Sequence, residues 1–283
     1  MPFPLVLLPL LAQVGPTGTQ MQAPLELPKR RPVTSVIRSV SPALRQASRL
    51  GDCLAQARTE PAAAVATANA WRNSANGPAR AEAEQCLGMA LSGQNQWSGA
   101  EQAFLSARDD SLASDKLSRA RFGAMAANAA LATNASERAL SLLDAAHGDA
   151  LGGGDTHLAA EVAIDRARAL VILKRDSDAV ASLAEATNGA PEIGTGWLLS
   201  ATLARRHGRL AEAQAAIEHA ATLQPLDPET GLEAGVIAVL SGHDEAARKS
   251  WQSVVASAPD SDSAKIARQY LDQLGPAAAP SSR

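Results

Sequence analysis

Residues 197–225 read WLLSATLARRHGRLAEAQAAIEHAATLQP and hold one full copy of a helical pattern that recurs in the C-terminal half of the chain. The recurring positions carry small or apolar residues and a final proline: Trp197, Ala201, Ala204, Gly208, Ala213, Ile217, Ala220 and Pro225. The later positions return one period further on as Gly242, Ala247, Trp251, Val254 and Pro259. They also occur one period earlier as Ala179, Leu183, Ala186 and Pro191. A constant period of about 34 residues predicts stacked helix pairs, each too small to bury its apolar face alone.

An earlier copy of the pattern begins near Ala79. Its first helix is marked by Leu87-Gly88-x-x-Leu91, and its second by Ala100-x-x-x-Phe104-x-x-Ala107. On these motifs the chain resembles the tetratricopeptide repeat (TPR) family, whose unit places Trp, Leu-Gly, Tyr, Ala, Phe, Ala and Pro in order across about 34 residues. The resemblance implies an all-α fold, a right-handed superhelical solenoid of antiparallel helix pairs.

Packing between paired helices follows from the same positions. Small residues such as Gly88, Ala201 and Gly235 let two helices approach closely. Larger residues such as Phe104, Ile217 and Trp251 fill the gap to the next helix. Prolines at 191, 225 and 259 are expected to separate one unit from the next.

The composition favours helix and argues against nucleic acid. Alanine fills more than a fifth of the 283 positions, whereas the chain has one Tyr and three Phe. Because alanine loses no side-chain entropy in a helix, this bias favours closely packed helices and no large aromatic pocket. The net charge is −3 with both signs mixed, and the one basic run, residues 29–31, lies between prolines. We therefore expect no nucleic-acid partner and no small-molecule substrate.

The N-terminus predicts an export signal. Residues 5–14 are apolar, too short to span a bilayer and followed by small residues, although no Lys or Arg precedes them. The sequence thus favours a periplasmic or secreted protein, with a cytoplasmic protein as the alternative. Membrane association would arise only through an uncleaved N-terminus.

These features divide the chain into consecutive segments. We predict a signal peptide at 1–14, a disordered Pro-rich linker at 15–42, a degenerate N-terminal helix pair at 43–78, the TPR array at 79–260, a capping helix at 261–274 and a disordered tail at 275–283. The central units are longer than the rest, since Ala100, Ala139 and Ala179 hold the same position in successive units but lie more than one period apart. The glycine-rich stretch at 147–155 predicts a flexible loop there.

Two cysteines, Cys53 and Cys86, are separated by nearly the length of one repeat. That spacing would place them on equivalent helices of neighbouring units. In an exported chain they could form a disulfide. The alternative is that each is a small, buried, reduced residue.

No catalytic motif is found in the sequence. There is no H-E-x-x-H and no G-x-S-x-G. The strongest metal candidate is His157, Glu161 and Asp165, which follow one another at every fourth position and so lie on one side of a helix. Because three ligands on one straight helix rarely surround a metal, we favour ordinary helix-start roles for them. We therefore expect no metal site, no cofactor and no enzyme.

In the TPR family the first helix of each pair lines the concave side of the solenoid, and the resemblance implies a partner-binding groove there. With the packing residues set aside, the residues expected to face it are Ile164, Arg168, Val171, Leu198, Thr202, Arg205, Arg206, Leu232, Val236 and Val239. Such an apolar surface with a few arginines suits an amphipathic helix or an extended apolar segment, with arginine binding an acidic group. The alternative is that the stripe is covered by the chain's own end helix or by tighter superhelical winding.

Three functions compete on this basis. The leading one is a non-enzymatic scaffold or adaptor of the cell envelope that binds a protein or peptide segment in the groove. The second is a structural subunit of a homo-oligomer or a larger envelope complex. A metal-dependent hydrolase is the least favoured, because it depends only on His157, Glu161 and Asp165.

Overall fold

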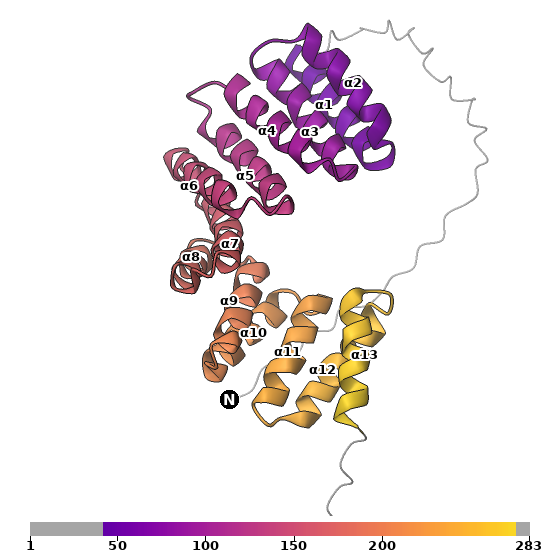
Figure 1. Cartoon of the computed structure of the whole chain (residues 1–283), viewed down its shortest axis with the longest axis vertical. Helices are drawn as coiled ribbons and strands as arrows, with labels where there is room; N and C mark the ends of the chain where they lie inside the picture. The colour runs from indigo at the N-terminus through magenta and orange to yellow at the C-terminus, as the bar shows by residue number, and fades with distance from the viewer. Residues whose placement is uncertain (1–41, 276–283) are drawn as a thin grey trace, which may run out of the picture. The chain divides into compact units, whose positions relative to one another are not determined.

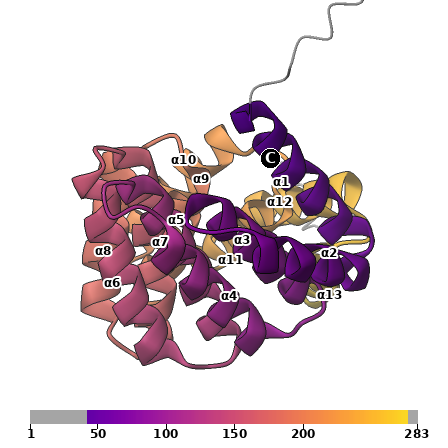
Figure 2. The same cartoon turned by 90° about the horizontal axis from the view of Figure 1, so that it is seen from above.

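The computed structural model describes the backbone of residues 42–275 and the side chains of residues 49–275. This part of the chain forms helices and no strand (Figures 1 and 2). The helices are α1 (Pro42–Thr59), α2 (Pro61–Ser74), α3 (Pro78–Gly93), α4 (Trp97–Asp110), α5 (Lys116–Ala132), α6 (Ser136–Gly152), α7 (Thr156–Ile172), α8 (Asp176–Gly189), α9 (Gly194–Arg206), α10 (Leu210–Leu223), α11 (Pro228–Leu240), α12 (Asp244–Ser257) and α13 (Asp262–Leu274). The predicted signal peptide at 1–14, the linker up to residue 41 and the tail from residue 276 lie outside the described residues.

The helices pack in the order of the chain, each on the next. Short turns join them, so α1 and α2, α3 and α4, and the later pairs are antiparallel (Figure 1). Most odd-numbered helices also pack on the next odd-numbered helix, whereas no such extensive contact joins two even-numbered helices in residues 42–275. The predicted all-α repeat of helix pairs is confirmed. The odd-numbered helices form its inner layer.

The predicted small-to-large packing holds the pairs together. A Cβ placed on Gly88 would lie 2.5 Å from the Phe104 ring, and one on Gly235 would overlap the Trp251 ring. Both aromatic side chains are buried, and the Trp251 Nε1–H donates to the Leu232 carbonyl at 3.1 Å. Glycine is thus required on α3 and α11 because the partner ring occupies the space of a side chain.

The predicted flexible loop at 147–155 is wrong. Helix α6 continues to Gly152, and only residues 153–155 form the turn before α7. Apolar residues on one face explain this, since Leu143, Ala146 and Ala150 are fully buried and extend the helix through the glycines. Gly153 lies tightly against Leu117 of α5, so a larger residue there would require the Leu117 side chain to move.

The long central repeats consist of longer helices. Helices α5, α6 and α7 have 17 residues each, whereas α8 to α12 have 13 or 14. The breaks elsewhere lie where the sequence places them. Pro191 and Pro225 each fall in the turn between two pairs, Pro259 falls in the turn between the last pair and α13, and Gly77, with φ of 53°, separates α2 from α3.

A disulfide joins the first two pairs. Cys53 of α1 and Cys86 of α3 are bonded, with their Cα atoms 6.0 Å apart. Both are buried beside Trp71 of α2, over whose ring the Arg49 guanidinium lies at 4.5 Å. The bond therefore fixes the N-terminal helix pair to the rest of the array.

Candidate partner-binding face

The inner layer of odd-numbered helices carries three hollows, which we name by their lining. The polar hollow lies among α5, α7 and α9, the apolar pocket among α7, α8 and α9, and the end pocket among α11, α12 and α13. Arg168 lines both the polar hollow and the apolar pocket, so these two adjoin. Together the three hollows form the candidate site.

The polar hollow has a volume of about 470 Å³ and carries several charged side chains. Asn128 of α5 donates from Nδ2 to Asp165 Oδ2 of α7 at 2.8 Å. The other oxygen of Asp165 accepts from Arg168 Nη1 at 2.5 Å. Arg121 lies 3.8 Å from Asp155, the N-cap residue of α7. These bonds connect α5 to α7 and leave most charges of this hollow compensated.

The apolar pocket has a volume of about 360 Å³. Its walls are aliphatic, with Arg168 and Arg206 at the edge: Ala167, Val171, Ile172, Leu183, Leu199, Thr202 and Leu203. The one hydroxyl in the wall, Thr202 Oγ1, donates back to the Leu198 carbonyl at 3.1 Å. The pocket therefore offers a ligand apolar surface inside and positive charge outside.

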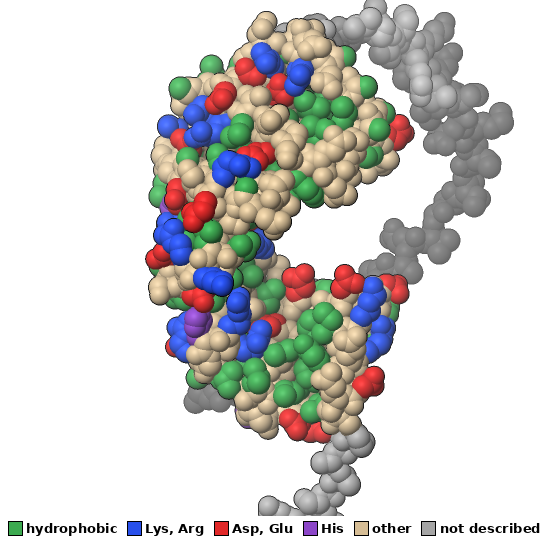
Figure 3. All heavy atoms as spheres, viewed as in Figure 1, with side chains coloured by type: hydrophobic (Ala, Val, Ile, Leu, Met, Phe, Trp, Pro, Cys, Tyr) green, Lys and Arg blue, Asp and Glu red, His purple; other side chains and the backbone are tan. Residues whose placement is uncertain are grey.

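The end pocket, of about 330 Å³, lies where the array finishes. Apolar side chains gather between α11 and α13 on the face shown in Figure 3. Val236 and Val239 of α11 line it, together with Trp251, Tyr270 and Leu274. Helix α13 packs on both α11 and α12, yet it leaves Leu240 53% exposed at the pocket edge.

The structure distributes the sequence-predicted groove residues unevenly. Those that line a hollow are Ile164, Arg168, Val171, Thr202, Arg206, Val236 and Val239. Leu198 and Leu232 instead pack against core clusters, and Ile164 is also largely buried. Arg205 is bonded to Glu233 of α11, with Nε to Oε1 at 2.5 Å, so it ties two inner helices together.

Several lining residues escaped the sequence analysis. Arg121, Met125 and Asn128 belong to α5, whose unit departs from the regular period, so the pattern assigned it no inner face. Asn128 lies 37 residues before its partner Asp165, and this longer offset is the only signal in the sequence that could have located it. Ile172 and Leu199 were missed because they flank predicted positions.

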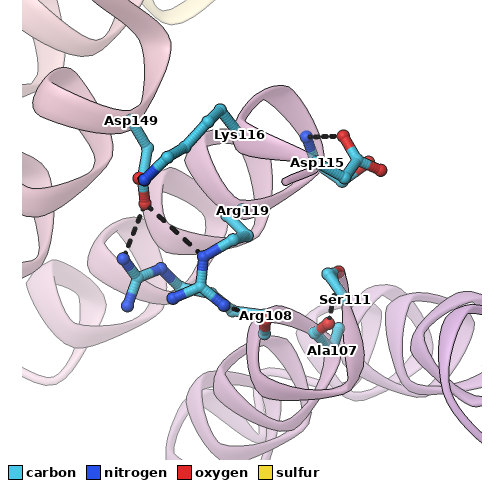
Figure 4. Close-up of polar contacts among 8 residues, drawn as sticks. Ala107, Arg108, Ser111, Asp115, Lys116, Arg119 and Asp149 are labelled. Atoms are coloured by element: carbon cyan, nitrogen blue, oxygen red, sulfur yellow. Dashed lines mark hydrogen bonds and ion pairs between the residues drawn. The ribbon is translucent and has the colours of Figure 1, made fainter. Parts of the chain in front are cut away.

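A buried carboxylate joins helices α4, α5 and α6 (Figure 4). Asp149 of α6 is 7% exposed and meets Arg108 Nη2 of α4 at 2.7 Å and Lys116 Nζ of α5 at 2.9 Å. Arg119 Nε lies 3.9 Å from Asp149 Oδ2, while Arg119 Nη1 donates to the Arg108 carbonyl. Burial alone would raise the pKa of Asp149, but these hydrogen bonds and charges hold the pKa below its ordinary value.

Two more buried carboxylates tie helices in the N-terminal half. Glu101 of α4 receives two bonds from Arg138 of α6, at 2.6 Å and 2.9 Å. Glu84 of α3 is 1% exposed, and its Oε2 lies 3.4 Å from Arg72 Nη1. Burial raises the pKa of Glu84, because the charges of Arg72 and Arg80 offset only part of the desolvation.

Residues 42–275 contain no group of three or more His, Cys, Asp or Glu side chains that could hold a metal. His157 Nδ1 lies 3.9 Å from Glu192 Oε1, while Asp165 is bonded to Asn128 and Arg168. None of the thirteen described helices is long and apolar enough to cross a membrane.

No protein-family model and no curated protein sequence matches this chain. Several solved structures, however, have a similar fold. PilW, described as a widely conserved type IV pilus biogenesis factor, superposes with a TM-score of 0.63 at 14% identity, over 78% of this chain and 97% of that one. PilF of Pseudomonas aeruginosa gives 0.62 at 14%, over 80% and 97%. The apo form of the quorum sensor NprR from B. thuringiensis gives 0.64 at 10%, over 82% and 71%. These likenesses show the fold, a TPR-type helical repeat.

Proposed function

Because this chain folds as a TPR-type solenoid, we propose that it is a non-enzymatic adaptor that holds a segment of a partner protein on its inner face. The observation that carries the proposal is the apolar pocket between α7, α8 and α9, with arginines at its edge. Concave sites lined by aliphatic side chains and a few placed polar groups are typical of binding sites.

The adaptor is proposed to act in the cell envelope or outside the cell. One sequence feature and one structural feature support this location: the apolar stretch at 5–14, typical of an export signal, and the buried disulfide, of the kind that persists in oxidising compartments. PilW, whose fold resembles this one, is described as a type IV pilus biogenesis factor. Sequencing the N-terminus of the mature native protein tests the location, since an intact Met1 would contradict export.

Site-specific photo-crosslinking tests the binding face. A photoreactive amino acid is placed at Thr202, which lines the apolar pocket on α9, or at Thr222, which is exposed on α10 and lines none of the hollows. Both side chains donate to a carbonyl one helical turn earlier, so the two replacements disturb similar bonds. A partner crosslinked from Thr202 and not from Thr222 supports the proposal. Equal labelling from both positions contradicts it.

The end pocket favours a second function, a structural subunit that assembles with its own copies. Leu240 and Leu274 border an apolar hollow at the last helix of the array, where a further unit could stack. Size-exclusion chromatography with light scattering separates the two functions. A Leu240→Asp substitution should convert an oligomer to a monomer under the second, and should leave a monomer unchanged under the first.

A further inference from the structure

The lining and the volume of the apolar pocket indicate which kind of side chain it binds. Among the side chains of its interior the one polar group is the Thr202 hydroxyl, whose hydrogen is donated to the Leu198 carbonyl, so that only its oxygen is left as an acceptor. A polar side chain placed there would exchange several hydrogen bonds to water for at most one to that oxygen. A volume of about 360 Å³ accommodates one large aliphatic or aromatic side chain. The interior thus selects a single bulky apolar residue.

The edge of the pocket carries one uncompensated charge. Arg206 is exposed and has no ion-pair or hydrogen-bond partner among the residues that the structure describes. The other arginine at the edge, Arg168, is bonded to Asp165. Neighbouring Arg205 is bonded to Glu233. A free guanidinium beside an apolar pocket is suited to a carboxylate, with which it can form two parallel hydrogen bonds.

One candidate occupant is the chain's own segment 1–41, which precedes the described residues. Its charge argues against this. It holds four basic residues, Lys29, Arg30, Arg31 and Arg38, and one acid, Glu26, which leaves a net charge of +3. A segment of this sign is repelled by Arg206, so the complementary occupant comes from another, acidic chain.

From these observations we infer that the apolar pocket binds an extended partner segment in which a large apolar residue lies within two positions of an Asp or Glu. The apolar side chain enters between α7 and α9, and the carboxylate pairs with Arg206. This inference specifies the partner chemistry of the adaptor role and depends on that role.

A displayed library of random peptides, selected on the purified full-length chain, tests the inference. The control is Arg58→Glu, because Arg58 of α1 is also exposed and also has no partner within residues 49–275. We expect the native chain and Arg58→Glu to enrich peptides with a large apolar residue next to Asp or Glu. Arg206→Glu should bind the same peptides about tenfold more weakly, the effect expected for reversing one solvent-exposed charge pair, and should itself enrich Lys or Arg at that position.

The outcomes separate the inference from the adaptor role. Apolar peptides enriched equally by the native chain and Arg206→Glu, with no charge preference, would overturn the inference and leave the adaptor role standing. No enriched peptide, together with no crosslink from Thr202, would overturn both. A fatty acid found in the pocket by native mass spectrometry, or binding restored only after residues 1–41 are removed, would also overturn the inference, since the occupant would then be an acyl chain or the protein's own segment.

Discussion

Replacing Asp149 by Asn should destabilise the array by about 3 kcal/mol. The carboxylate is 7% exposed and accepts charged hydrogen bonds from Arg108 and Lys116, each of which contributes about 1.5–3 kcal/mol. Breaking a buried ion pair costs about 3–5 kcal/mol. We choose the lower end because Lys116 is 46% exposed and can regain water, and because Asn keeps one acceptor.

The control is Asp144→Asn, the same change on the same helix. Asp144 pairs with Arg166 at 2.7 Å, but it is 53% exposed, and exposed pairs contribute no more than about 1 kcal/mol. With an m-value of about 3 kcal/mol/M, urea unfolding followed by circular dichroism should show a midpoint about 1 M lower for Asp149→Asn. Hydrogen exchange then locates the loss, because repeat arrays can unfold in parts.

A similar midpoint for both variants would refute the reasoning. It would mean that the three cations around Asp149 are held by the packing of α4, α5 and α6, and not by the carboxylate. The reasoning would also be refuted if Asp149→Asn lowered the urea midpoint while the hydrogen-exchange rates of α6 stayed unchanged.

Three further predictions follow from the same structure. Because the pKa of Asp149 lies below its ordinary value of about 3.9, its stabilisation is present above that pH and is lost as the pH falls further; acid titration of the native chain should show this loss, and Asp149→Asn should not. Replacing both Cys53 and Cys86 by Ala should cost about 3–4 kcal/mol, the chain-entropy value for a sequence separation of 33, and reducing the native chain should speed proteolysis of α1 and α2 to the same extent. Gly235→Ala should lower the melting temperature, because the new Cβ overlaps Trp251 at a cost of about 1–3 kcal/mol in stability. Gly148→Ala should raise the melting temperature, because a Cβ there meets nothing within 4 Å and alanine stabilises a helix by about 1 kcal/mol relative to glycine.

The sequence contains enough information for the helix pairs because their packing is local. Gly88 and Phe104, or Gly235 and Trp251, belong to one pair, and their fixed spacing reflects one geometry that each unit repeats. Wherever the period holds, the helices and their turns can therefore be predicted. In the central units the period changes, and residues 147–152 were wrongly predicted as loop because their glycines outweighed the buried face of α6.

The site is less predictable because it depends on contacts between units. Arg205 follows the pattern of a groove residue, yet Glu233 lies 28 residues further on and pairs with it. Asp149 meets Arg108 across 41 residues and Lys116 across 33, so the same carboxylate pairs at two different separations. Such pairs are set by the angle between successive units, which depends on helix length and packing. A periodic pattern indicates which helix lies inside, but it does not indicate which charges remain free.

The distribution of these ties explains how the array can keep an open pocket. In a solenoid each unit is stabilised by itself and by its neighbours, so buried carboxylates in α3 to α6 cannot compensate for apolar surface left exposed between α7 and α9. That region depends on its own core, where Leu170 and Leu183 are buried, and on links such as His147 to Glu185 across α6 and α8. Closing the pocket with a larger side chain would therefore stabilise α7 to α9 directly. That it stays open, with Arg206 unpaired beside it, is the reason to place partner binding there and not along the tightly bonded N-terminal half.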